Sequence, residues 1–192
     1  QAICDFDYGL AEGVRKTYRR LYKKHLAEAL DLLADGAVDD ARSFAQDALA
    51  RIEGQTGVWA SLEMDEGFEA GVRAALVEAG MDEATAGKAL SYAAKNAFAD
   101  TDRATFQAME ALVHNLNTMH SRAGAQTPFS SVNYGMDTSP EGRMVVRNML
   151  LATEEGLGSG ETPIFPVQIF RVKEGVNYNP EDPNYDLFKL AM

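Results

Sequence analysis

The stretch from residue 121 to residue 126 combines one cation with unusually small neighbours. Arg122 stands among Ser121, Ala123, Gly124 and Ala125, which carry little side-chain bulk. A loop of this composition lets its backbone come close to a ligand. The arginine supplies planar donors for a base edge or a phosphate, and the glutamine that ends the stretch offers both a donor and an acceptor.

The residues that follow predict a strand with polar side chains inside a core. Pro128 stands near its start, Phe129 and Val132 are apolar, and Ser130 and Asn133 carry a hydroxyl and an amide. Polar groups removed from water need partners, so such a strand either satisfies its own neighbours or offers these groups to a ligand. The residues alone leave both alternatives open.

Composition limits the classes of protein to which the chain can belong. Its 192 residues fit one ordinary domain, and a formal net charge of -11 argues against a general affinity for nucleic acid or anionic lipid. We expect no membrane span and no signal peptide. The single cysteine excludes an internal disulfide and suits a reducing cytoplasm. Because the sequence begins without Met and ends within a helical pattern, we interpret it as an internal piece of a longer protein.

Hydrophobic periodicity predicts that the first part of the chain is mainly helical. Apolar residues recur at spacings of three and four, and Asp82 is expected to cap one helix while Asp100 or Thr101 begins another. We expect Trp59 to anchor a core and Cys4 to be a small buried apolar residue. The predicted helices cover 10–33, about 39–52, two stretches between 65 and 96 divided at Gly80, and a last one that reaches Met119.

A run of cations on the first predicted helix invites a phosphate-binding interpretation. A charged run on an amphipathic helix is more often a solvated face, and we favour that interpretation here. The run consists of Arg15, Lys16, Arg19, Arg20, Lys23 and Lys24.

The last third of the chain predicts alternating strands and helices with short connections. After the strand near 128–134, Ser139 or Thr138 begins a helix, a strand follows over 163–172, and a final helix starts near 182. We expect the second strand to be of the buried parallel kind. Arg143 and Arg147 share one helix face, where they bind an anion or, as we favour, pair with Glu154 and other surface carboxylates.

No metal or nucleophile pattern stands out from the spacing of reactive residues. His114 and His120 are six residues apart, which is neither one helical turn nor two, and the one cysteine is remote from both. We therefore predict no metal site within the chain.

Two stretches of the sequence carry a resemblance to a known family. One is HSRAGAQTPFSSVNYG at 120–135, continued by MDTSPEGRMVVRNMLLATEEGLGSGETPIFPVQIFRVKEGVNYNPEDPNYDLFKL, and the other is Ile3-Cys4-Asp5-Phe6-Asp7-Tyr8 with Leu10-Ala11. They resemble the catalytic subunit of the anaerobic, oxygen-sensitive class of ribonucleotide reductase. The resemblance is dense over residues 110–192, while the helical middle is only weakly diagnostic.

This resemblance implies a fold. The class is α/β and mostly helical, and the chain would be part of the ten-stranded α/β barrel of glycyl-radical enzymes, interrupted by a helical excursion. Residues 1–119 would form a mainly helical segment after a barrel strand, and residues 120–192 a β-α-β-α segment of the barrel. A piece of a barrel has open strand edges, so we expect it to associate with another copy.

The resemblance also implies an activity for the full-length protein: reduction of ribonucleoside triphosphates to deoxyribonucleoside triphosphates. A radical-SAM activating enzyme installs a glycyl radical, which generates a thiyl radical on a cysteine. The implied partners and cofactors are ATP and deoxynucleotide effectors, a second copy of the chain, and zinc in a C-terminal part. The thiyl cysteine, the glycyl-radical segment and the zinc cysteines have no match here, so the chain alone is expected to be inactive. The alternative is a non-catalytic nucleotide-binding or dimerisation module.

The resemblance places a small-residue loop between the effector nucleotide and the substrate base. In this sequence that loop matches residues 121–126, and an effector that prefers one loop state would favour one substrate. The alternative is that Arg122 is a structural cation paired with a carboxylate. The predicted substrate and effector residues are Ser121, Arg122, Ala123, Gly124, Gln126, Ser130 and Asn133.

Overall fold

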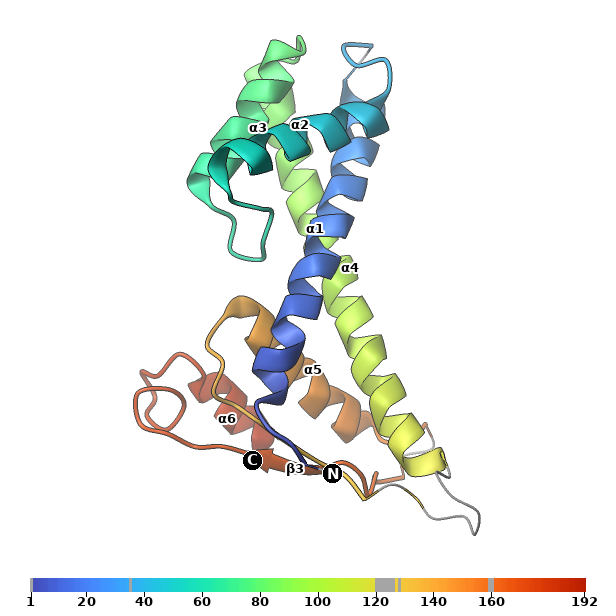
Figure 1. The fold of residues 1–192 in the computed structure, drawn as a ribbon, viewed down its shortest axis with the longest axis vertical. Helices are drawn as coiled ribbons and strands as arrows, with labels where there is room; N and C mark the ends of the chain where they lie inside the picture. Colours follow the sequence, from blue (N-terminus) through green and yellow to red (C-terminus); the bar gives the residue numbers. More distant parts are fainter. Residues whose placement is uncertain (1, 35, 120–126, 128, 159–160) are drawn as a thin grey trace. The chain divides into compact units, whose positions relative to one another are not determined.

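A computed structural model describes residues 2–34, 36–119, 127, 129–158 and 161–192 of the chain (Figure 1). This part of the chain is mostly helical, with one small parallel sheet. Contacts group the chain into two compact units. We call residues 1–14 with 102–192 the sheet unit, and residues 15–101 the helical unit. The predicted division between residues 119 and 120 stays a prediction.

The sheet unit contains three parallel strands with β2 in the centre. The strands are β1 (Ala2–Ile3), β2 (Ser131–Tyr134) and β3 (Val167–Phe170), and β2 pairs with the other two. Two helices, α5 (Pro140–Glu155) and α6 (Tyr185–Ala191), complete the predicted alternation of strand and helix (Figure 1). The parallel pairing of β2 with β3 fits the β-α-β connection that the short loops predict.

The side chains of the sheet alternate between two unlike faces. Tyr134 is buried and donates a hydrogen bond to Gln168, which in turn donates to Thr153 of α5 at 2.6 Å. The aromatic ring of Phe170 packs against Phe188 of α6. Because strand side chains alternate, the neighbouring positions point to the other side. We call that side the open face; it carries Ala2, Ser131, Asn133, Val167 and Ile169.

The open face explains why β3 is less buried than the sequence predicts. Val167 and Ile169 are each 43% exposed, whereas an enclosed parallel strand would hide both faces. The described strand is also limited to four residues instead of the predicted ten. The predicted parallel strand is confirmed over Val167–Phe170, whereas its predicted burial and its predicted extent over 163–172 are wrong for this structure.

Helix α5 begins where its sequence predicts. Ser139 is the N-cap and accepts a hydrogen bond from the backbone N–H of Gly142 at 3.1 Å, and Pro140 occupies the first turn. Its buried side is apolar, with Val145 and Met149 fully buried. Because of this amphipathic pattern, the apolar side of α5 packs against the core of the sheet unit.

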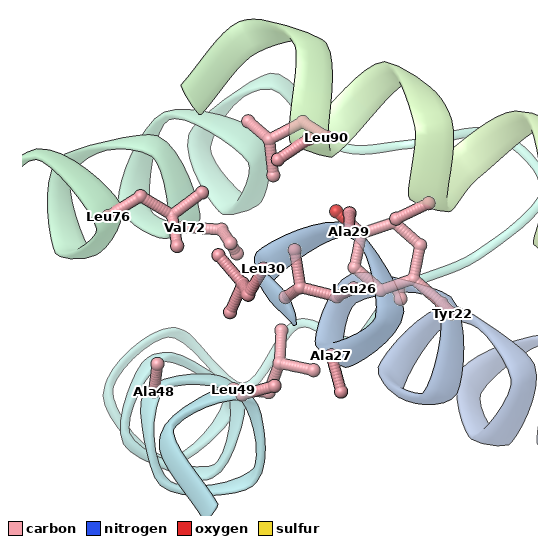
Figure 2. Packing of buried hydrophobic residues seen from close by; sticks show 14 of the residues in the cluster. Tyr22, Leu26, Ala27, Ala29, Leu30, Ala48, Leu49, Val72, Leu76 and Leu90 are labelled. Atoms are coloured by element: carbon pink, nitrogen blue, oxygen red, sulfur yellow. The ribbon is translucent and has the colours of Figure 1, made fainter. Parts of the chain in front are cut away.

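The helical unit packs four helical stretches around one apolar core. It contains α2 (Ala41–Thr56) and α3 (Glu66–Glu78), together with the parts of α1 (Phe6–Leu33) and α4 (Glu83–Thr118) that fall within 15–101. Burying large side chains from all four stabilises the unit through the hydrophobic effect. Its core includes Tyr22, Leu26, Leu30, Leu49, Val72, Leu76 and Leu90 (Figure 2).

Local capping determines where these helices begin. Asp40 accepts from the backbone N–H of Ser43 at 3.0 Å, and Asp65 accepts from Phe68 at 2.8 Å. The predicted cap Asp82 accepts from the N–H groups of Ala84 and Thr85, both at 3.0 Å. Each carboxylate satisfies donors that the first helical turn leaves unpaired. No helix in the described part of the chain is long and apolar enough to cross a membrane.

Two helix boundaries differ from the predictions. Helix α4 is continuous through Asp100 and Thr101, where a new helix was expected to begin. Capping residues also occur inside helices when burial and good helix formers outweigh their local preference, and Thr101 is fully buried here. Helix α1 begins at Phe6 instead of residue 10, directly after Asp5, whose φ of 52° marks the break in the chain.

Two single-residue predictions were also wrong. Trp59 is not a core anchor, because 48% of it is exposed and the guanidinium carbon of Arg19 lies 5.4 Å from its ring centroid. That arrangement is a cation–π contact, which suits an exposed ring. Cys4 is exposed instead of buried.

Candidate functional site

Two of the seven predicted substrate and effector residues belong to the described structure. Ser130 and Asn133 lie just before and within β2, the central strand. The other five lie outside the described residues: Ser121, Arg122, Ala123, Gly124 and Gln126. The described part of the candidate site therefore consists of β2 and the groups that contact it.

Ser130 and Asn133 each hold a polar atom that is buried and unsatisfied. Among the described residues, the Oγ of Ser130 and the Oδ1 of Asn133 have no hydrogen-bond partner. Ser130 as a whole is 8% exposed, and its carbonyl accepts from the N–H of Val167 at 2.9 Å. An unsatisfied buried polar group costs about 1–3 kcal/mol. Both side chains can therefore gain free energy from a ligand or a further segment that supplies donors.

The structure does not place these two side chains on one face. Strand alternation puts Asn133 on the open face, beside Ile169 in the register of β2 with β3. Ser130 follows the alternation of Val132 and Tyr134, which point to the side that α5 and α6 cover. Asn133 is half-buried and has an unpaired acceptor on the face away from α5 and α6, so it is the better placed of the two to contact a small molecule.

The carboxyl end of β2 is fixed by a buried carboxylate from the first turn of α1. Asp7 is fully buried, and its Oδ2 accepts hydrogen bonds from three consecutive backbone N–H groups. The donors are Gly135 at 2.9 Å, Met136 at 3.0 Å and Asp137 at 3.0 Å. The other oxygen accepts from the N–H of Tyr8 at 3.1 Å. Hydrogen bonds to an ionised acceptor are the strong ones, so Asp7 holds the turn that follows the strand.

Two buried asparagines join the same turn to the loop before α6. Asn177 donates from Nδ2 to the carbonyl of Gly135 at 2.8 Å and to that of Arg171 at 2.9 Å. Asn184 donates to the carbonyl of Asp137 at 2.8 Å. Gly135 has a φ of 109°, and a Cβ there would lie 3.1 Å from the Arg171 carbonyl, so the turn requires glycine.

Arg143 extends this polar network to the surface. It donates to Asn184 Oδ1 and to Asp186 Oδ2, both at 2.7 Å, and also to the Pro183 carbonyl. The Nη1 of Arg147 lies 3.7 Å from Asp102 Oδ1. The expectation that both arginines pair with surface carboxylates is confirmed, although in the described structure the partners are not Glu154.

Three functional residues were not predicted from the sequence: Asp7, Asn177 and Asn184. Each lies in a polar stretch that predicts a turn or a helix start, and nothing in their spacing indicates complete burial. Their partners in the turn after β2 lie 42 to 130 residues away in the sequence. Only the turn chemistry of the Asn-Pro and Asp-Pro pairs around the loop gives a local signal.

The described residues hold no group of three or more His, Cys, Asp or Glu side chains that could bind a metal ion. Burial raises the pKa of the Tyr134 hydroxyl above its ordinary value of 10.0, which keeps it a neutral hydrogen-bond donor to Gln168. The site around β2 is thus one of amides, hydroxyls and backbone groups, suited to binding and positioning.

Comparison with known proteins identifies the family to which the chain is similar. The family model described as "Anaerobic ribonucleoside-triphosphate reductase" matches residues 1–192. Relatives with this name include those of Haemophilus influenzae, 38% identical over 92 residues, and Escherichia coli, 36% identical over 93 residues. The relative from Enterobacteria phage T4 is 39% identical over 105 residues.

These relatives are much longer than the stretch they share with the chain. The matched residues are 47%, 48% and 54% of this chain, but 13%, 13% and 16% of the three relatives. The similarity to individual relatives is therefore partial, whereas the family model covers every residue. On the strength of that full match, the chain belongs to the anaerobic ribonucleoside-triphosphate reductase family.

Proposed function

We propose that the chain is part of an anaerobic ribonucleotide reductase that converts ribonucleoside triphosphates to deoxyribonucleoside triphosphates. Within that enzyme it supplies barrel framework and a loop for substrate and effector. Membership of the family supports the proposal, as do relatives named for this activity. A glycyl radical and a thiyl radical supply the difficult chemistry in the whole enzyme. Because no residue of this chain matches their positions, we assign binding and positioning to it.

The three parallel strands are proposed to be part of a ten-stranded α/β barrel. Helices cover one face of the sheet, as on the outside of a barrel, and the open face would then line the interior. The exposed apolar side chains Val167 and Ile169 suit such a covered interior position. Asn133 would point inward beside them.

The observation that carries the proposed role is the buried, unpaired Oδ1 of Asn133 on the open face of β2. A carbonyl oxygen of this kind accepts a hydrogen bond from a ribose hydroxyl or from an amino group of a base. Residues 121–126 precede this strand, with residues 127–130 in between, and would form the loop that responds to the effector. Coupling of this kind typically amounts to about 1–3 kcal/mol between two ligands.

The further parts of the proposal concern partners and location. We propose ribonucleoside triphosphates and effector nucleotides as ligands, and a radical-SAM activating enzyme and a second copy of the chain as partners. The cytoplasm is the proposed compartment. Zinc and the glycyl radical are proposed for the full-length enzyme, outside the residues of this chain.

The test is Asn133→Ala in the full-length enzyme. We expect kcat/KM for the ribonucleotides to fall about tenfold, which corresponds to about 1.4 kcal/mol of lost transition-state stabilisation. The glycyl radical signal in electron paramagnetic resonance should stay unchanged, because Asn133 does not take part in forming it.

Asn115→Ala is the matched control, because it removes an exposed amide from α4 in the same unit. It should leave kcat/KM within twofold of the parent. If Asn133→Ala lowers stability while the kinetic constants and the substrate preferences stay as they were, the residue is structural and the proposed role is wrong.

A further inference from the structure

We infer that the helical unit carries a binding groove for a polyphosphate anion between α1 and α2. This site involves none of the residues proposed above for substrate and effector, so it does not depend on that proposal. It is formed by residues between Lys16 and Ala60, all within the helical unit.

Two adjoining cavities make up the groove. One has a volume of about 610 Å³ and the other about 410 Å³, and both are lined by Arg20, Lys23 and Gln46. Arg42 of α2 lines the larger cavity. A volume of several hundred Å³ is the size at which proteins hold a small molecule such as a nucleotide.

The charge of this groove is opposite to that of the chain. Six cations line it, against the three carboxylates of Glu28, Asp31 and Glu53, which leaves a net charge of +3. The whole chain has a formal net charge of -11. A cluster of cations on a protein whose net charge is negative raises the concentration of anions near that cluster. The six are Lys16, Arg19, Arg20, Lys23, Lys24 and Arg42.

Half of these cations are already engaged within the chain. Arg19 hydrogen-bonds to Glu53, and Lys24 Nζ lies 3.5 Å from Glu28 Oε1. Lys16 also has an interaction. In the described structure Arg20, Lys23 and Arg42 have neither a hydrogen bond nor an ion pair from their side chains. These three therefore remain available to an incoming anion.

The arrangement along α1 is unfavourable unless something neutralises it. Arg20 is three residues before Lys23, a spacing at which like charges on a helix repel each other, and neither side chain is paired in the described structure. The chain has 29 acidic residues, so carboxylates to pair with are not scarce. A bound anion would remove this repulsion, and so it accounts for the arrangement better than a solvated face does.

The donors favour phosphate over other anions. Arg20 and Arg42 approach from two helices with planar guanidinium groups, which bind phosphate oxygens in pairs, and Lys23 adds a compact ammonium. Glu28 and Asp31 at the same groove oppose an extended polyanion such as a nucleic acid strand. A short phosphate chain is therefore the ligand class, either free or as part of a nucleoside triphosphate.

The test is isothermal titration calorimetry of the 192-residue chain with tripolyphosphate, ATP and adenosine at constant ionic strength. We expect saturable binding of tripolyphosphate and ATP, and none of adenosine. The variant Arg20→Gln/Lys23→Gln/Arg42→Gln should weaken tripolyphosphate binding at least tenfold. Equal affinities for tripolyphosphate and ATP would identify the phosphate chain as the ligand, and a tighter ATP complex would identify a nucleotide.

The control variant is Arg51→Gln/Lys88→Gln/Lys95→Gln, which removes the same charge from the same unit outside the groove. Its tripolyphosphate affinity should stay within twofold of the parent, and circular dichroism should show both variants folded. Equal weakening in both variants would mean a nonspecific charge effect and overturn the inference. Undiminished binding in the groove variant, or no saturable binding by the parent chain, would overturn it as well.

Discussion

The helix caps of the helical unit bond to residues next to them in the sequence, whereas the carboxylate that fixes the end of β2 in the sheet unit bonds to residues far away. In the helical unit, Asp40, Asp65 and Asp82 cap helices two or three residues away. In the sheet unit, Asp7 reaches three backbone groups about 130 residues away. The sheet unit also contains the buried, unpaired acceptor of Asn133 on the open face. The caps of the helical unit can therefore form from local sequence alone, whereas the placement of β2 depends on contacts between distant residues.

The largest effect is expected from Asp7→Ala in the sheet unit. The change leaves three buried N–H groups without their shared acceptor, so we expect a loss of about 3–5 kcal/mol in the free energy of unfolding. Urea denaturation followed by circular dichroism measures it. Asp5→Asn is the control, because it removes the charge of an exposed ion pair with Arg171, worth about 0–1 kcal/mol, and Asn tolerates the φ of 52° at this position. Equal losses in the two variants would contradict the long-range role of Asp7.

A second experiment compares one glycine from each unit. Gly142→Ala should destabilise the sheet unit by about 1–3 kcal/mol, because the new Cβ would lie 2.2 Å from Oδ2 of Asp137. Gly54→Ala, inside α2, should stabilise the helical unit by about 0.5–1 kcal/mol, since nothing lies within 4 Å of the added methyl group. Thermal melts of the two variants give opposite shifts if the comparison holds, and shifts of the same sign would break it.

The smallest effect concerns the pH dependence of the helical unit. Burial raises the pKa of Tyr18 to about 12 from an ordinary value of 10.0. As the pH rises, the Tyr18 hydroxyl therefore loses its proton in the unfolded chain before it does so in the folded chain. The contribution of the neutral hydroxyl to the free energy of unfolding is complete below about pH 10 and is lost as the pH rises to about 12. We expect Tyr18→Phe to reduce this decline by about 1 kcal/mol. Urea titrations at pH 9 and pH 11 measure it, and an undiminished decline in the variant would exclude Tyr18 as its source.

The elements that follow from short-range patterns could be predicted from the sequence. The Asp82 cap, the Ser139 cap and the parallel pairing of β2 with β3 each depend on residues close together or on a connection rule. The prediction of a helix boundary at Asp100 or Thr101 was wrong because burial inside a long helix outweighed a local capping preference.

The candidate site could be predicted only in part, for a similar reason. The polar side chains of the strand indicated Ser130 and Asn133, and both indeed hold buried polar atoms. Their spacing of three residues places them on opposite faces of any strand that contains both. Which of the two lies on the open face depends on the register, because a shift of one residue exchanges the two faces. Asp7 and Asn184 were missed because their roles arise from contacts that no local pattern encodes.

The contact between Arg19 and Trp59 gives the molecule a built-in optical probe. Trp59 is the single tryptophan of the chain, so its fluorescence reports on the helical unit without interference from the sheet unit. Arg19 covers the ring and also lines the smaller of the two groove cavities. An anion that draws the guanidinium away from the indole would change the emission intensity. The groove can therefore be titrated in the unlabelled protein.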